Sequence, residues 1–195
     1  MKSFLLTGLL AFASCTSVFS QDTAAATTPN LIGKRYVETQ FSYIDYSGSS
    51  DFALGTAFNQ PLNASFDAGA AFVHTQEEGN DSHNYQVFGL NLTGHHDFGK
   101  TRAFARGTIN YEWWSVKNLW WYQADVGLER ALCDRVLFTA YVSWLDFFSS
   151  TFIDSSISGT AKLTYWATPE IGLSAAASMI ERGAVAGRLG VAFVF

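Results

Sequence analysis

The sequence is poor in charged residues, in cysteine and in long apolar runs. Charged residues make up 15% of the 195 residues, against roughly 25% in an ordinary soluble domain. Besides Cys15 near the N-terminus, only Cys133 is present, which excludes an internal disulfide and a cysteine metal site in the remaining chain. The net charge of −5 argues against a nucleic-acid partner. After the N-terminal segment, no apolar stretch is long enough to form a membrane-spanning helix.

The first twenty residues match the pattern of a secretory signal peptide. Lys2 precedes a short apolar core, and small residues follow up to Ser20, as in such signals. Removal of residues 1–20 would change the net charge from −5 to −6, since Lys2 is their only charge. The run Phe12-Ala-Ser-Cys15 also resembles a lipoprotein box with Phe in place of the usual Leu, so processing at the cysteine is the alternative. Residues 21–33 are expected to form a flexible segment.

From residue 34 onward, short alternating runs are separated by turn residues, and no helical period is evident. Tyr85 and Gln86 fit the alternation poorly, so a β-bulge is expected there. An even number of strands places both ends of the barrel domain, residues 34–195, on the same side. The ten expected strands cover about 34–45, 51–59, 64–75, 83–94, 101–113, 119–130, 135–146, 152–166, 171–181 and 185–195.

The two faces of these strands differ in character. One face carries Phe, Leu, Ile, Val and Trp, and the other carries Gly, Ala, Ser and Thr with occasional charges. Small residues suit a narrow interior, whereas a water-facing exterior would be rich in Lys and Glu. We therefore predict an all-β fold, a closed antiparallel up-and-down transmembrane β-barrel of about ten strands with short loops, because open sheet edges are costly in lipid. A soluble lipocalin-like ligand-binding barrel is the alternative, and it would place the Phe and Leu face inside.

The last expected strand has an apolar face that ends in aromatic residues. This face holds Leu189, Val191, Phe193 and Phe195, and Arg188 lies on the other face. The segment resembles the C-terminal strand of bacterial outer-membrane β-barrels, whose final Phe and alternating apolar residues are read by the assembly machinery. The resemblance implies an outer-membrane location and a porin-like or structural role. It also implies outer-membrane lipid and, during biogenesis, the barrel-assembly machinery as partners.

Aromatic residues make up 16% of the chain and gather near the expected strand ends. Rings at two levels are typical of the aromatic girdles of membrane barrels. We assign the following residues to membrane interfaces: Tyr111, Trp113, Trp114, Trp120, Trp144, Tyr165 and Trp166.

Nine ionisable residues are expected to face the lumen. Charges in a low-dielectric lumen need partners, and neighbouring strands could pair Glu38 with Arg188, Arg106 with Asp125, and Arg102 with Glu129. Two interpretations stay open: a plug of ion pairs that fills a small barrel, and a charged constriction that lines a narrow pore for small solutes. The nine residues are Glu38, Asp67, Arg102, Arg106, Glu112, Asp125, Glu129, Lys162 and Arg188.

No residue is assigned a catalytic or metal-binding role, and no cofactor is expected. His74 and His83 flank one polar loop, and His95 and His96 lie in an expected turn beside Asp97. No set of Ser, His and Asp occurs at a convincing spacing. An outer-membrane enzyme acting on lipid or peptide is the alternative function, and it would need a rim pocket with a histidine beside a carboxylate and a hydroxyl.

Overall fold

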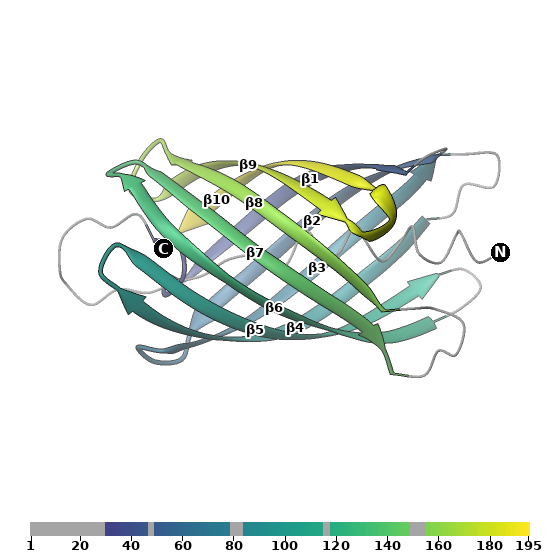
Figure 1. Ribbon diagram of the computed structural model, residues 1–195, viewed down its shortest axis with the longest axis horizontal. Helices are drawn as coiled ribbons and strands as arrows, with labels where there is room; N and C mark the ends of the chain where they lie inside the picture. The colour runs from purple at the N-terminus through teal and green to yellow at the C-terminus, as the bar shows by residue number, and fades with distance from the viewer. Residues whose placement is uncertain (1–29, 47–48, 79–83, 115–117, 149–154) are drawn as a thin grey trace.

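The computed structural model describes residues 30–46, 49–78, 84–114, 118–148 and 155–195. In these residues the chain forms ten antiparallel strands that close into a barrel (Figure 1). Each strand pairs with its neighbours in the sequence, and the first strand closes the ring against the last. The predicted closed all-β up-and-down barrel is therefore confirmed. No helix in the described ranges is long and apolar enough to cross a membrane.

The strands lie close to the ranges that the alternation predicts, and a short 3-10 helix, η1 (Glu181–Gly183), precedes the last one. The fourth strand extends four residues beyond its expected end, to Phe98. The expected start of the eighth strand at residue 152 lies outside the described residues. The strands are β1 (Tyr36–Tyr46), β2 (Ser49–Pro61), β3 (Phe66–Glu78), β4 (Asn84–Phe98), β5 (Thr101–Trp114), β6 (Asn118–Cys133), β7 (Val136–Phe147), β8 (Ser156–Trp166), β9 (Ile171–Ile180) and β10 (Val185–Val194).

The predicted bulge at Tyr85 and Gln86 is wrong. Tyr85 pairs with Thr75 on β3 and with Trp114 on β5, and neither register is interrupted there. The alternation is hard to read at this point because a large aromatic ring, buried at 2% exposure, occupies an inward position. The register shift in the described residues lies instead at Ala131 to Cys133, where β6 approaches its turn to β7.

The barrel is apolar outside and polar inside. The outward side chains of Phe41, Leu90 and Leu189 are 48%, 56% and 66% exposed. Inward positions carry most of the buried hydroxyl, amide and charged side chains. A soluble barrel would bury its large apolar residues, whereas a membrane barrel presents them to lipid. The wall is therefore of the membrane type, and the soluble lipocalin-like alternative is wrong.

The connections distinguish two ends of the barrel. The turn end carries the short turns around residues 62–65, 99–100, 134–135 and 167–170, and Phe195 lies there too (left in Figure 1). The opposite end, which we call the loop end, carries the other connections, including η1. Residues 30–35 enter β1 from the turn end, so both ends of the described barrel lie on one side, as an even number of strands requires.

The ring closes along an uninterrupted seam between β1 and β10. Paired positions run from Tyr36 opposite Val194 to Asp45 opposite Val185. Beyond the Tyr36–Val194 pair, the Phe195 amide donates a hydrogen bond to the Arg35 carbonyl at 3.1 Å. Since every backbone polar group inside lipid needs a partner within the protein, this seam is a requirement of the fold.

Aromatic rings gather on the outer wall near the loop end. Tyr111 contacts Trp120 with ring centroids 4.8 Å apart, and Tyr122 contacts Trp144 at 5.4 Å. Tyr165 lies toward the turn end and is 47% exposed. Of the residues assigned to the membrane interfaces, those on the outer face are Tyr111, Trp113, Trp120, Trp144 and Tyr165.

The interior holds large side chains as well as small ones, contrary to the expectation of mainly small residues. Gly127 of β6 faces inward between Phe104 of β5 and Tyr141 of β7, whose ring centroids lie 6.2 Å apart. A Cβ atom at Gly127 would lie 2.8 Å from Phe104 Cζ and would also collide with Tyr141 Cβ and the Ala140 carbonyl oxygen. The missing side chain therefore makes room for two rings inside the barrel.

We expect Gly127→Ala to destabilise the barrel by about 1–3 kcal/mol, the usual cost of overpacking. The measurement is urea unfolding of the protein refolded in lipid vesicles. Gly107→Ala is the matched control, because a Cβ atom at Gly107 on β5 would meet nothing within 4 Å. Equal midpoints for the two variants would show that the close approach at Gly127 does not constrain the fold.

Candidate functional site: the charged lumen

All nine ionisable residues predicted to face the lumen lie on the inner face and are buried. None of them is more than 7% exposed. The alternation of each strand places them there, because successive side chains point to opposite faces of the wall. They are Glu38 of β1, Asp67 of β3, Arg102, Arg106 and Glu112 of β5, Asp125 and Glu129 of β6, Lys162 of β8 and Arg188 of β10.

Arg106 and Asp125 form the ion pair expected from neighbouring strands. They lie directly opposite in the β5–β6 register. Arg106 Nε donates to Asp125 Oδ2 at 2.6 Å, and Gln123 Nε2 donates to Asp125 Oδ1 at the same distance. The guanidinium also lies 5.9 Å from the Phe104 ring centroid and 5.7 Å from that of Tyr141. The pair is thus held by hydrogen bonds and by cation–π contacts.

Glu38 pairs across the lumen with Lys162 instead of Arg188, so the predicted Glu38–Arg188 pair is wrong. Lys162 Nζ lies 2.6 and 2.8 Å from the two Glu38 carboxylate oxygens. Ser174 Oγ of β9 donates to the same carboxylate at 3.0 Å. The β1–β10 register places Arg188 opposite Ser42, four residues along β1 from Glu38, and its guanidinium donates to Ser178 Oγ at 2.5 Å.

The ion pair joins strands that are not neighbours. β10 and β9 lie between β1 and β8 in the ring, so the Lys162 side chain reaches over two strands. Both side chains are 1% exposed. The pair therefore crosses part of the lumen and connects β1, one of the two strands of the closing seam, with β8.

Arg102 and Glu129 face each other in the β5–β6 register, and each forms a hydrogen bond with a further group. Arg102 Nε and Nη2 donate to the two oxygens of Asp97 at 2.5 and 2.6 Å, a bidentate pair between β5 and β4. Glu129 Oε2 accepts the backbone N–H of Ile32 at 3.0 Å. The register is the expected one, and a direct Arg102–Glu129 ion pair stays a prediction.

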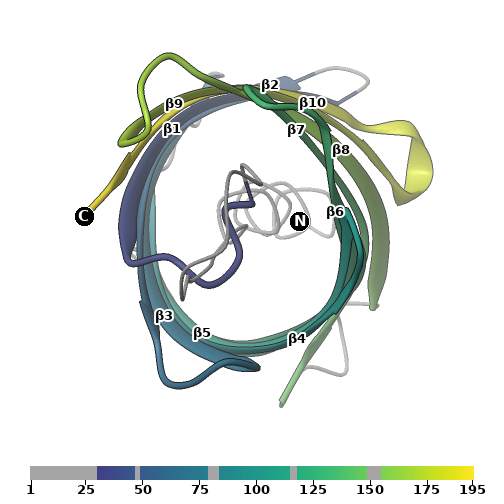
Figure 2. The ribbon, with the colours of Figure 1, turned by 90° about the vertical axis from the view of Figure 1, so that its left-hand side faces the viewer.

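Residues 30–35, which we call the N-terminal strap, lie inside the barrel at the turn end. Figure 2 shows this segment, in purple, within the ring of strands. Asn59 Nδ2 donates to the Lys34 carbonyl at 3.3 Å, and Lys34 Nζ lies 5.4 Å from the Trp166 ring centroid. Gly33 has a φ of 97°, which glycine adopts without steric cost.

The strap buries two apolar side chains in the lumen, Leu31 at 0% and Ile32 at 1% exposure. The sequence predicts a flexible segment over residues 21–33, and this prediction is wrong for residues 30–33, while residues 21–29 lie outside the described ranges. The apolar pair directly before a glycine is the sequence signal that could have indicated an ordered segment. The strap packs in one cluster with Tyr36, Phe104, Leu137, Tyr141, Trp166 and Ala192.

Trp114 and Trp166 do not lie at the lipid interface, and their assignment is corrected. Trp166 is 5% exposed and packs against the strap inside the barrel. Trp114 stacks on Tyr85, and its indole N–H donates to Glu112. The indole N–H of Trp121 donates to the same carboxylate at 3.2 Å. An indole inside the lumen satisfies a buried carboxylate while its ring fills space.

The histidines do not form a catalytic or metal-binding group in the described residues. His74 lies on the outer face of β3, where its Nδ1 is 3.3 Å from Gln86 Nε2. His95 and His96 belong to β4 rather than to a turn, and His95 Nε2 lies 3.7 Å from Asp67 Oδ1. No group of three or more His, Cys, Asp or Glu side chains in these residues could hold a metal ion. His83 lies outside the described residues.

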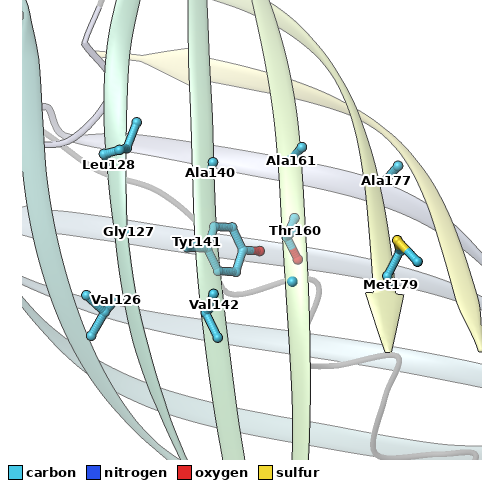
Figure 3. Close-up of a pocket in the computed structure, with 11 residues that line it drawn as sticks. Val126, Gly127, Leu128, Ala140, Tyr141, Val142, Thr160, Ala161, Ala177 and Met179 are labelled. Carbon is cyan, nitrogen blue, oxygen red and sulfur yellow. The ribbon is translucent and has the colours of Figure 1, made fainter. Parts of the chain in front are cut away.

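The outer wall carries a shallow apolar groove of about 600 Å³ over β6 to β9. The short side chains of Ala140, Ala161 and Ala177 form its floor, and Val126 and Met179 stand beside them (Figure 3). The groove opens on the lipid-facing side and holds no charged residue. Tyr141 and Thr160, whose side chains lie on the inner face, also line it, but none of the nine charged lumen residues does.

The closed ring, the apolar exterior and the charged lumen together define a membrane-type β-barrel. No protein-family model and no curated protein matches the chain. Among solved structures, the translocator domain of the autotransporter NalP from Neisseria meningitidis is similar, with a TM-score of 0.51 and 11% identity over 100% of this chain and 96% of that chain. A second is the NanC porin, with a TM-score of 0.50 and 9% identity over 80% and 98%. The chain thus has the fold of bacterial outer-membrane β-barrels.

We expect Lys162→Met to destabilise the barrel by about 3–5 kcal/mol, because it leaves the buried Glu38 carboxylate without a compensating charge. Urea unfolding of the refolded protein in vesicles measures the change. The double variant Glu38→Gln with Lys162→Met removes both charges, and we expect it to recover more than half of the loss. A single variant as stable as the unchanged protein would contradict a structural role for the pair.

Proposed function

We propose that this chain is a bacterial outer-membrane protein of the porin-like or structural kind, with a lumen that admits at most small solutes. The observation that carries the proposal is the charged lumen inside a wall of exposed apolar side chains. This arrangement suits a bilayer, where the wall faces lipid and the charges stay inside. The fold shared with the NanC porin agrees with the proposal.

The contacts inside the barrel support a narrow lumen. The Lys162–Glu38 pair spans from β8 to β1, and the Arg106–Asp125 pair lies on the facing wall formed by β5 and β6. Barrels of eight strands are filled by side chains, and barrels of sixteen leave an aqueous channel. A barrel of ten strands that also holds several long charged side chains is therefore expected to resemble the filled eight-stranded barrels more than the open sixteen-stranded ones.

The N-terminal strap supports closure at the turn end. Leu31 and Ile32 are buried in an apolar cluster that spans from β1 to β8 and β10, and the Ile32 amide is held by Glu129. A polar solute leaving the lumen at this end would have to displace the strap. Of the two interpretations of the lumen, this favours a plugged barrel over a permanently open pore.

We infer no enzymatic role. The candidate rim pocket required a histidine beside a carboxylate and a hydroxyl, and His74 instead lies on the outer face next to Gln86. The buried carboxylates Glu38 and Asp125 are engaged in ion pairs with Lys162 and Arg106. A group held in this way is poorly placed to transfer protons to a substrate.

We expect the refolded protein to give small conductance steps or none in a planar lipid bilayer. The double variant Leu31→Asp with Ile32→Asp places two carboxylates in the apolar cluster and should release the strap, since burying unpaired charge is costly. We expect its conductance to rise at least severalfold. Steps as large as those of sixteen-stranded porins from the unchanged protein would contradict the proposal.

Leu62→Asp serves as the control for the strap variant. Leu62 lies in the turn between β2 and β3 and is 58% exposed, so the same kind of substitution adds charge at the turn end without touching the strap. We expect this variant to conduct like the unchanged protein. If both substitutions raise the conductance equally, the strap does not close the lumen.

We also propose that the outward row Leu189, Val191, Phe193 and Phe195 is the signal that the barrel-assembly machinery reads. Phe193→Ser with Phe195→Ser should lower the amount of protein in the outer-membrane fraction at least severalfold. Phe98→Ser is the control, because Phe98 at the end of β4 is 63% exposed and Phe195 is 65% exposed. Immunoblots of membrane fractions measure the amounts. Recovery of the unchanged protein in the soluble periplasm would contradict the outer-membrane location itself.

A further inference from the structure

The lumen changes character toward the loop end. Three buried acids, Asp51, Glu77 and Glu112, lie there on inward positions. Around them the inner wall is apolar, in contrast to the paired charges nearer the turn end. The apolar cluster of this half includes Ile44, Val73, Tyr85, Val87, Leu119, Trp121, Leu145 and Phe147.

Asp51 differs from the other two acids of this half in its lack of hydrogen-bond partners. It is 0% exposed, and neither of its carboxylate oxygens has a hydrogen-bond partner among the described residues. Its partner across the β2–β3 pair is Glu77, another acid. Asp67, whose oxygens also lack hydrogen bonds, has the His95 ring nitrogen at 3.7 Å. Burying a carboxylate beside a second acid costs free energy, because the negative charge has no opposite charge near it. A bound cation would supply that opposite charge.

The buried bases of the described residues are engaged elsewhere. Lys162 binds Glu38 and Arg106 binds Asp125. Arg102 binds Asp97, and Arg188 donates to Ser178. Glu112, the third acid of the loop end, accepts from two indole N–H groups, which carry no charge. Among the described residues, none of these contacts reaches the Asp51 carboxylate.

Aromatic rings flank the unpaired carboxylate. Ile44 of β1 lies opposite Asp51, and Tyr46 follows it two residues later on the same face. Tyr85 lies opposite Thr75, two residues before Glu77 on β3, and Tyr46 packs against the apolar cluster that includes Tyr85. Trp114 extends this surface, because its ring is stacked on Tyr85 with centroids 4.9 Å apart and planes 14° apart. Ring faces attract cations, and the same rings offer contact to an apolar group.

We propose that the loop-end half of the lumen binds an organic cation, a primary ammonium ion that carries an apolar substituent. The Asp51 carboxylate accepts the ammonium N–H groups, Glu77 adds a second negative charge, and Tyr46, Tyr85 and Trp114 contact the substituent. A divalent metal fits less well, because Ca²⁺ takes six to eight oxygen ligands and the described residues hold no metal-binding group of three acidic, His or Cys side chains. The inference rests on the proposed function in one respect: the cation has to reach the site from solution through the loop end of the barrel.

Isothermal titration calorimetry tests the site, with benzylammonium chloride titrated into the refolded protein in zwitterionic micelles. We expect saturable binding, and Asp51→Asn should weaken it roughly tenfold or more, as expected for the loss of a charged hydrogen-bond acceptor. Glu77→Gln should weaken it severalfold. Asp51→Asn keeps the side-chain shape and removes an unpaired buried charge, so this variant should fold at least as well as the unchanged protein.

Asp45→Asn is the matched control, because Asp45 lies on β1 at the same end, pairs with Ser50, and is exposed on the outer face. It removes the same charge and should leave the affinity within twofold. Benzyl alcohol, a neutral analogue, should give no saturable heat. The proposal is overturned if the unchanged protein gives no saturable heat, if Asp51→Asn binds as tightly, or if benzyl alcohol binds equally. Binding in micelles depends neither on conductance nor on cellular location, so its failure is distinct from failure of the proposed function.

Discussion

Pairing of backbone hydrogen bonds is the constraint on which this structure depends. In a hydrocarbon environment an unpaired N–H or C=O group costs several kcal/mol, so a sheet there has to close on itself. The seam between β1 and β10 meets this requirement over ten paired positions. Closure in turn separates an outer face, which suits lipid, from an inner face that has no lipid contact. Closure therefore explains why the outer face is apolar, why the charged side chains lie inside, and why both ends of the barrel chain lie on one side.

Closure also confines the polar side chains of the barrel to a common lumen, which they divide into regions. Near the turn end, the strap and its apolar cluster cover the interior. Farther along, Arg106–Asp125 and Glu38–Lys162 pair charges from strands on different parts of the ring. Buried ion pairs add little stability compared with apolar packing, so their value here lies in selecting one arrangement of the lumen. Toward the loop end, Asp51 has no hydrogen-bond partner among the described residues, and its neighbour across the β2–β3 pair is a second acid, Glu77.

The strand ranges and the faces of most residues could be predicted because both follow from a period of two along the chain. The Arg106–Asp125 pair could be predicted for the same reason, since these residues face each other on consecutive strands. For Trp114 and Trp166 the sequence predicts outward positions, because aromatic rings near strand ends usually lie there, but both rings lie inside, where they fill space beside Glu112 and the strap. The strap itself escaped prediction because residues 30–33 form no alternating run that a pattern could reveal.

The sequence alone determined the class of fold and the polarity of its two faces, because alternation decides which side of a strand each residue occupies. It also placed nine charges in the lumen, but it missed Asp51 and Glu77, which lie at strand ends where the alternation is hard to read. Only the tertiary structure decided which of them meet, as Glu38 and Lys162 show. Their contact depends on the curvature of the closed ring and on the stagger between strands, which bring together positions 124 residues apart. No local pattern encodes those two quantities, since they arise only when all the strands have joined.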